Sequence, residues 1–309
     1  MNLLPLANVL PSDSTLSQAS AAATSQSFAV VPLVDIAKSI RAVPVAPEVL
    51  PKLQSRLQDV DTDISDLAAL IRLDAGLAAS VLKSSNSAYY TRGSRVTSIE
   101  EAVSVIGYEE TLRIVARCSY STVMKGSLAC YGISGEMLWE EAVLAALAMD
   151  QLSQMADCDS SEAYISGLLH AVGMVAINDY LLRTGRPNDV APQGSLEAIA
   201  QWEIHAIGHH HGKVAAAMMQ QWRFASSVVL AAERLPEPSV SSDDTVLSCL
   251  LPLGVTIAKH VAAHPDDDGA ADPEFDLARA KRAGLDRRQC VEMVATVRSH
   301  WKQTKQFLV

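Results

Sequence analysis

The sequence predicts an all-α protein, and three observations lead to this expectation. Only 5% of the 309 residues are aromatic, while Ala, Leu and Val are abundant, so helix formers outnumber residues typical of strands. The strict apolar–polar alternation of a half-buried strand is scarce. Apolar residues instead recur three and four positions apart, and 49% of the chain is hydrophobic, which is enough for a large buried core.

Residues 1–31 are predicted to form a flexible tail. The stretch from Pro11 to Ser27 is rich in Ser, Ala, Thr and Gln and has few large apolar side chains. An alternative is that the leucines near the start of the chain dock as a short helix onto the body. These leucines are Leu3, Leu4, Leu6 and Leu10.

Residues 32–130 are predicted to form an N-terminal lobe of short helices. The first helix opens at Pro47. Asp63 and Asp74 are the expected N-caps of the next two helices, and Ser98 to Glu101 is a capping box that starts a fourth. Gly107 suits the end of that helix, and the chain from Tyr108 to Met124 is expected to form another.

A polar loop with two tyrosines follows the helix that Asp74 caps, and we interpret it as a candidate interaction surface. The residues proposed for this surface are Asn86, Ser87, Tyr89, Tyr90, Arg92 and Arg95. The alternative is that Asn86 and Ser87 only cap the helix end while the tyrosines cover the core.

Residues 131–238 are predicted to form a second helical lobe, and residues 239–309 a helical extension packed on it. A Ser-rich start at Ser160 precedes apolar positions on one helix face, and the pattern is interrupted at Gly173. His170 is expected at the end of that apolar face. In the extension, helices are expected from Thr245 to His264 and from about Leu285 to Trp301.

Several of these motifs, in the same order, resemble the HDOD (HD-related output domain) family, a degenerate branch of the HD phosphohydrolase superfamily. The resemblance covers roughly Val43 to Pro238 and implies a two-lobed multi-helix bundle with an HD-like C-terminal lobe. The matching segments are Pro47–Leu50, Leu70–Asp74, Asn86–Tyr90, Ser98–Ala102 with Gly107, Leu138–Ala142, Gly167–His170, Gly208–Ala215 and Trp222.

In catalytic HD domains, as the resemblance implies, histidines and aspartates hold the metal ions. The early His position falls here on Glu141, the His-Asp pair on His170 and Ala171, and a later His on His211. The remaining ligand positions fall on Leu235 and Pro236 and near Val255. Because Ala171 offers only a methyl group, we predict a vestigial pocket with no metal, no cofactor and no catalysis, and a His170 that is hydrogen-bonded to backbone.

A second group of histidines needs a separate interpretation. His205 and His209 have the i, i+4 spacing of metal ligands, but Gly208 interrupts the helix between them. We therefore expect His205, His209, His210 and His211 to be surface or capping residues rather than a metal site.

Composition also restricts the partners and the compartment. The formal net charge of −10 would repel nucleic acid and anionic lipid, although Leu67 to Leu82 could be taken for a helix-turn-helix. The five cysteines show no CxxC spacing, which fits reduced thiols. No unbroken apolar run approaches the roughly 18 residues of a spanning helix, and Met1 to Ala37 lacks the Lys or Arg of a signal peptide. We expect a cytoplasmic protein without membrane insertion.

The resemblance and the missing ligands together predict a non-catalytic regulatory module for signal transduction, acting by protein–protein interaction. Its expected partners are sensor kinases, response regulators or cyclic-di-GMP turnover enzymes, acting in trans because the chain carries none of their motifs. The alternative is a divergent metal-dependent phosphohydrolase that uses Glu141, His170 and His211 around one metal.

Overall fold

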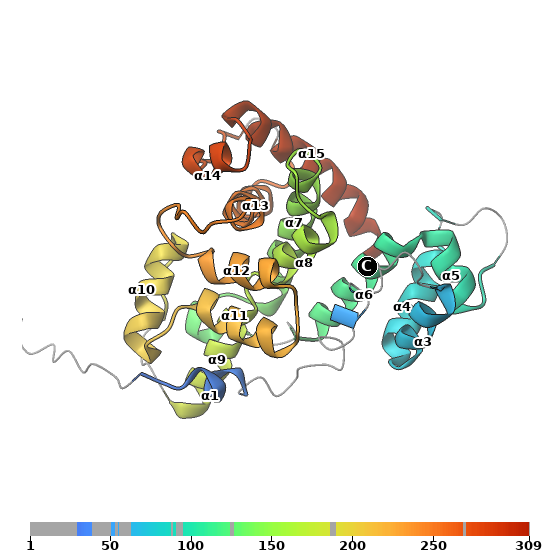
Figure 1. The fold of residues 1–309 in the computed structure, drawn as a ribbon, viewed down its shortest axis with the longest axis horizontal. Helices are drawn as coiled ribbons and strands as arrows, with labels where there is room; N and C mark the ends of the chain where they lie inside the picture. The colour runs from blue at the N-terminus through green and yellow to red at the C-terminus, as the bar shows by residue number, and fades with distance from the viewer. Residues whose placement is uncertain are drawn as a thin grey trace, which may run out of the picture.

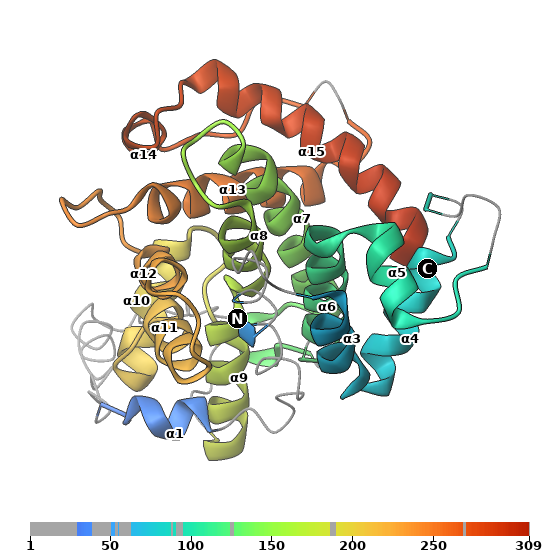
Figure 2. The same cartoon turned by 45° about the vertical axis from the view of Figure 1, so that its right-hand side comes forward.

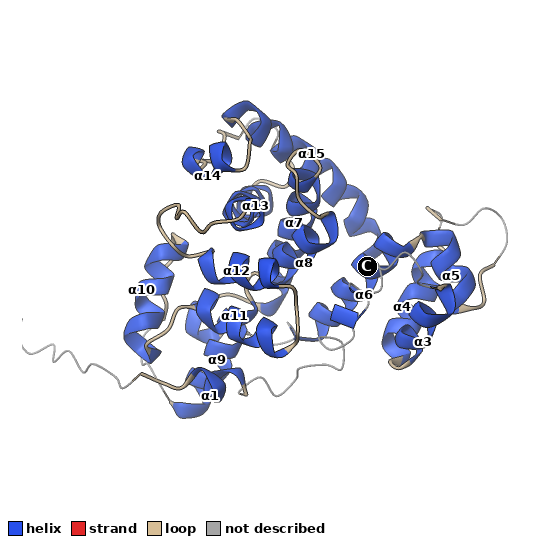
Figure 3. Ribbon diagram, in the orientation of Figure 1, coloured by secondary structure: helices blue, strands red, loops and turns tan. Residues whose placement is uncertain are grey.

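The computed structural model describes residues 30–38, 51–52, 55, 63–87, 89–90, 95–123, 127–185, 190–267 and 270–308. Within these ranges the chain forms helices and no strand; one isolated antiparallel bridge joins Leu128 and Ile133 (Figure 3). The all-α prediction is confirmed. The N-terminal leucines, the helix start at Pro47 and Arg92 lie outside the described residues.

The first lobe contains α3 (Ile64–Arg72), α4 (Ala75–Ser85) and α5 (Ile99–Ile106). Each predicted cap is present: Asp63 accepts from Ser65 N, Asp74 from the amides of Gly76 and Leu77, and Ser98 from Glu101 N. Gly107 ends α5 with a positive φ of 87°, a conformation that favours glycine. The apolar faces of α3 and α4 pack against α5.

The helix α6 (Tyr108–Val123) connects the two lobes (Figures 1 and 2). One side of α6 packs against α4 and α5, and another packs against α8 of the second lobe. The helix α6 is therefore shared by both lobes and joins the helices α3 to α5 to the second lobe.

The second lobe is built around three helices, α7 (Gly135–Ser153), α8 (Ser160–Leu169) and α13 (Val246–Ala263), which pack against one another. A Cβ on Gly167 would lie 2.6 Å from the Ala145 carbonyl oxygen, so α8 approaches α7 more closely than any other residue would permit. The surrounding elements are η1 (Ala129–Tyr131), α9 (Val172–Thr184), α10 (Leu196–Ile207), α11 (His211–Gln221) and α12 (Ser226–Arg234).

The central helix differs in two details from its prediction. Its N-cap is Asp159, which accepts from Glu162 N, rather than a residue of the Ser-rich stretch. The break falls at His170 and Ala171, and Gly173 lies inside the first turn of α9. Gly173 allows α9 to pack closely against the backbone of His211 and does not end a helix.

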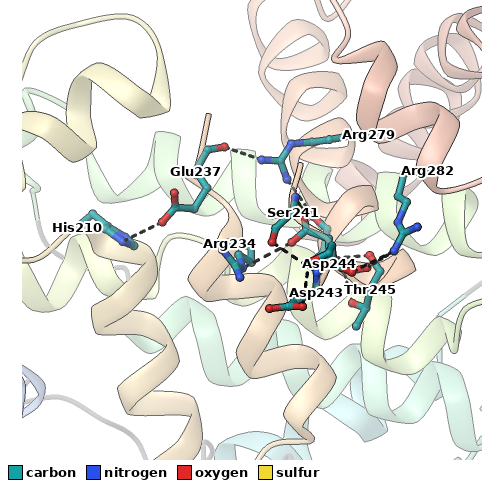
Figure 4. Close-up of polar contacts among 11 residues, drawn as sticks. His210, Arg234, Glu237, Ser241, Asp243, Asp244, Thr245, Arg279 and Arg282 are labelled. Atoms are coloured by element: carbon teal, nitrogen blue, oxygen red, sulfur yellow. Dashed lines mark hydrogen bonds and ion pairs between the residues drawn. The ribbon is translucent and has the colours of Figure 1, made fainter. Parts of the chain in front are cut away.

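Residues 239–309 are joined to the second lobe by a buried arginine (Figure 4). Arg279, in α14 (Leu277–Arg282), donates to the carbonyl oxygens of Glu237 and Ser248 at 2.5 and 3.5 Å and pairs with Asp276 at 3.1 Å. The last helix, α15 (Arg287–Leu308), packs along α7 and α13. Because α13 also packs against α8 and α12, it is part of the core of the second lobe rather than an outer layer.

The segment before the first lobe lies on the second lobe. The helix α1 (Leu33–Ala37) packs against α9 and α11, and Val31 N donates to Ile207 O at 3.0 Å. The sequence-based boundaries placed residues from 32 onward with the first lobe, so the structure differs at this point. A backbone hydrogen bond to a residue so far along the chain leaves no local sequence signal.

Two stretches are apolar and long enough to span a membrane, contrary to the expectation from unbroken apolar runs. They are Ser160–Thr184, which includes α8 and α9, and Val246–Ala263, which is α13. Inside the protein, 83% and 61% of their most apolar windows are buried. Helices buried to this extent are typical of the core of a protein, so these two stretches are weak evidence for a membrane span.

Candidate functional site

His170 is the C-cap of α8 and is almost completely buried. Its Nδ1 donates to the carbonyl oxygen of Gly167 at 2.8 Å, as expected for a core histidine bonded to backbone. Its Nε2 lies 3.6 Å from Oε1 of Glu141, which projects from α7. Two of the three side chains predicted for the vestigial pocket, Glu141 and His170, are therefore brought together, and the third, His211, pairs with Glu203 instead.

The same oxygen of Glu141 faces a second nitrogen. Lys259 Nζ, on α13, lies 3.9 Å from Glu141 Oε1. Burial by itself would raise the pKa of Glu141, but the nearby imidazole of His170 and the charge of Lys259 outweigh it, so the pKa lies below its ordinary value. Glu141 is thus held as a carboxylate between two basic side chains.

Tyr120, on α6, adds a buried hydroxyl that makes no hydrogen bond to any described residue. Burial and, to a smaller extent, the negative charge of Glu141 raise the pKa of Tyr120 far above its usual value, so the phenol stays neutral. Four helices, α6, α7, α8 and α13, supply the side chains of this cluster.

His211 belongs to a different buried cluster. Both its backbone N–H and its Nδ1 donate to Oε2 of Glu203, at 2.6 and 2.8 Å, and the Tyr131 hydroxyl donates to Oε1 at 2.7 Å. Glu203 and His211 are fully buried, and His211 Nε2 has no hydrogen-bond partner in the described part of the chain. The carboxylate fixes which nitrogen of His211 carries the proton.

Glu203 and Lys259 are members of these two clusters that sequence reasoning missed. A signal for Glu203 existed, because it lies on the apolar face of α10 with Ile199, Ala206 and Ile207, where a carboxylate must find buried partners. Lys259 gave a similar signal, since it is the only Lys or Arg within α13. Neither pattern names the partner.

The donor set does not fit a divalent metal ion. Ala171, which the family resemblance places at the position of a ligating aspartate, is fully buried and presents a methyl group. Across the described residues, no three His, Cys, Asp or Glu side chains come together in a group that could hold a metal. Glu141 and His170 lie side by side, while His211 pairs with Glu203 instead.

Of the histidines around Gly208, His205 is exposed and His210 is a cap, as expected, whereas His211 is fully buried against Glu203, contrary to the expectation of a surface or capping residue. His210 is the N-cap of α11 and accepts from Lys213 N at 3.1 Å. Its Nε2 lies 3.9 Å from Glu237 Oε1 (Figure 4). His209 Nε2 donates to Val31 O at 2.9 Å, which helps to hold the α1 segment on the second lobe.

In the loop after α4, the candidate interaction residues have different positions. The Asn86 side chain closes the base of the loop: its Nδ2 donates to Val96 O at 2.8 Å and its Oδ1 accepts from Val96 N at 2.9 Å. The Ser87 hydroxyl is buried without a partner among the described residues. Tyr89 is 71% exposed and Arg95 is exposed, while the Tyr90 ring is half-buried and meets Tyr89 edge-on.

A polar network joins this loop to the second lobe through α6. Tyr90 hydrogen-bonds Glu110, and the pKa of Tyr90 is raised by burial and by the charge of that carboxylate. One and two turns further along α6, Arg113 pairs with Asp150 of α7 and Arg117 Nη1 donates to the Tyr164 hydroxyl of α8 at 3.1 Å. The loop is therefore attached to a rigid element that contacts both lobes.

Comparison with known proteins gives one family. The family model of the HDOD domain matches residues 43–238. An uncharacterized protein of Treponema pallidum (strain Nichols) is 26% identical over 201 residues, which cover 63% of this chain and 37% of that protein. The match therefore spans little more than a third of the length of that relative.

Three solved structures share the fold over most of this chain. A candidate phosphohydrolase from Shewanella amazonensis SB2B has a TM-score of 0.63 at 18% identity and covers 90% of this chain and 98% of its own. An HDOD domain protein of unknown function from Geobacter sulfurreducens has a TM-score of 0.60 at 17% identity, and the match covers 87% of this chain and 95% of that protein. A candidate signal transduction protein from Marinobacter aquaeolei VT8 has a TM-score of 0.63 at 21% identity, and the match covers 91% of this chain and 62% of that protein.

Proposed function

The chain belongs to the HDOD domain family, and on that basis we propose that it is a non-catalytic signalling module that works in the cytoplasm by binding other proteins. The observation that carries the proposal is the buried methyl group of Ala171 beside His170. A catalytic HD domain has an aspartate at this position. Without its carboxylate, the pocket lacks the full set of oxygen donors that a hard cation needs to activate a water for phosphodiester hydrolysis.

The interface that we propose is the loop after α4. Tyr89 presents a large exposed aromatic side chain, of the kind that contributes most to binding when it is covered by a partner. Asn86 is fixed to the backbone of Val96 and Tyr90 to Glu110, so these two side chains lose little conformational entropy when a partner binds. Arg95, also exposed, adds a positive charge to the surface of an acidic protein.

The partners that we propose are sensor kinases, response regulators or cyclic-di-GMP turnover enzymes encoded in the same genome. The structural likeness to a candidate signal transduction protein supports this class. Nucleic acid is not proposed as a partner, because the net charge of −10 opposes binding to a polyanion.

The experiment is a binding assay with purified proteins of these three classes, using the full chain and its Tyr89→Ala variant. We expect at least one partner to bind the full chain and the variant to bind it at least tenfold more weakly, since an aromatic anchor contributes about 2 kcal/mol or more. Leu182→Ala is the control, because Leu182 is an exposed apolar side chain of the second lobe. If Tyr89→Ala and Leu182→Ala bind alike, the loop is not the interface.

A divergent phosphohydrolase is the second candidate, and one observation favours it. The His211 imidazole is oriented by Glu203 with Nε2 buried and unpaired, which is how metal-ligating histidines are commonly held. Hydrolysis of a model phosphodiester in the presence of Mn²⁺ or Fe²⁺, abolished by His170→Ala, would establish this function. We expect no hydrolysis above that of the buffer with metal.

A further inference from the structure

At the vestigial pocket, a single carboxylate oxygen is shared by two basic groups. Glu141 Oε1 is 3.6 Å from His170 Nε2 and 3.9 Å from Lys259 Nζ. These side chains come from α7, from the C-cap of α8 and from α13, the three helices that form the core of the second lobe. The position next to Glu141 and His170 is where the family resemblance places a metal ion.

Lys259 does not face solvent alone. Its side chain is 37% exposed, while Val255, Ala258 and Val261 of α13 near it are apolar and buried. Thr256, His260, Ala262 and Ala263 are not buried, so Lys259 lies at the edge of this apolar surface, where a lysine can extend its stem along the surface and place the ammonium at one end of it. Here the ammonium is directed toward Glu141 rather than away from the helix bundle.

The charges at this pocket also balance. A divalent ion would be matched by several anionic ligands, but Ala171 removes one carboxylate and leaves Glu141 as the acid that contacts His170. One carboxylate requires one positive charge, which Lys259 supplies. The loss at position 171 and the lysine at position 259 are therefore complementary.

We propose that the Lys259 ammonium takes the structural place of the metal cation, so that the second lobe keeps the helix arrangement of a metal-binding lobe without a metal. A tethered ammonium neutralises Glu141 and holds α13 against α7, but it offers no open coordination position for a water. This inference concerns how the lobe is held together and does not depend on which partner the loop binds.

The test is Lys259→Met, with Lys213→Met as the matched control because Lys213 is exposed on α11 of the same lobe. In EDTA, Lys259→Met should melt several degrees lower than Lys213→Met, since Glu141 loses the partner for its buried charge. Added Mn²⁺ or Zn²⁺ should leave both melting temperatures unchanged, because Glu141 and His170 beside the methyl group of Ala171 are too few donors to hold a metal ion.

The double variant Glu141→Gln/Lys259→Met covers the case in which Lys259→Met does not fold. It removes both charges, so it should fold and should recover most of the lost melting temperature without a response to metal. The inference is overturned if Lys259→Met melts like Lys213→Met in EDTA, or if the double variant is as unstable as Lys259→Met. The inference is also overturned if the unmodified chain holds a stoichiometric metal and its melting temperature drops when EDTA removes that metal. The proposed non-catalytic function is a separate matter, and only phosphodiester hydrolysis by the protein would overturn it.

Discussion

Gly173, in the first turn of α9, lies directly against the backbone of His211. A Cβ atom on Gly173 would be 2.0 Å from the His211 carbonyl oxygen and 3.0 Å from Ala215 N. On the other side of α11, a Cβ on Gly212 would be 2.6 Å from the Ala232 carbonyl oxygen of α12. Two glycines thus allow α11 to lie between α9 and α12, and this position brings His211 to Glu203.

Gly173→Ala should destabilise the protein by about 3 kcal/mol or more, because neither backbone can move away without separating α9 from α11. Gly76→Ala is the control: Gly76 lies inside α4, and its added Cβ would meet only the flexible Asp74 side chain at 3.1 Å. In that helix the alanine should change stability by less than about 1 kcal/mol. Chemical denaturation of both variants measures the difference; similar stabilities would contradict the close approach at Gly173.

Glu203→Gln should destabilise the second lobe by about 3–5 kcal/mol, the usual effect of breaking a buried charged network. The carboxylate accepts from the Tyr131 hydroxyl and from two nitrogens of His211, and an amide group cannot accept at both of its ends. Glu197→Gln, exposed on the same helix, should leave the unfolding transition in place. A small effect of Glu203→Gln would mean that the cluster is hydrated and loosely held.

Asn86→Ala should open the base of the candidate interaction loop. Both Val96 backbone groups would lose their partner, which we expect to lower the free energy of unfolding by about 1–3 kcal/mol. Amide hydrogen exchange at Val96 should become faster in the same variant. The neighbouring Ser87→Ala should be close to neutral, because the Ser87 hydroxyl is buried without a hydrogen bond to any described residue.

Asp150 should make stability depend on pH in an unusual direction. Burial raises the pKa of Asp150 above its ordinary 3.8, although the Arg113 guanidinium acts to lower it. The folded protein therefore binds this proton more tightly than the unfolded chain, and that contribution is complete below pH 3.8 and is lost as the pH rises through the raised value.

The free energy of unfolding of the wild-type chain, minus that of Asp150→Asn, should consequently fall as the pH increases across this window. Denaturation of both proteins at several pH values measures the difference, and the other titrating groups cancel. A difference that rises with pH would show that the ion pair with Arg113 outweighs burial.

Local patterns were enough to predict α3 to α6 of the first lobe, together with α8, α13 and α15. Asp63, Asp74 and Ser98 cap α3, α4 and α5, because an N-cap needs only a side-chain oxygen and an amide two or three residues later. The pair Glu141 and His170 was also predictable, through the order of motifs that resembles the family. Their interaction depends on two helices that such motifs place together.

Contacts between residues distant in the chain were decided by tertiary packing. A hydrogen bond between Val31 and Ile207 holds the α1 segment on the second lobe. Lys259 pairs with Glu141 and Arg113 pairs with Asp150, and in each case the two residues lie on different elements. Apolar periodicity shows which face of a helix is buried but not which helix covers it. The sequence alone therefore determined the fold class and the absence of a carboxylate at Ala171, while only the packed structure showed that His170 and Lys259 meet at Glu141, since Coulomb interactions depend on distance in space and not along the chain.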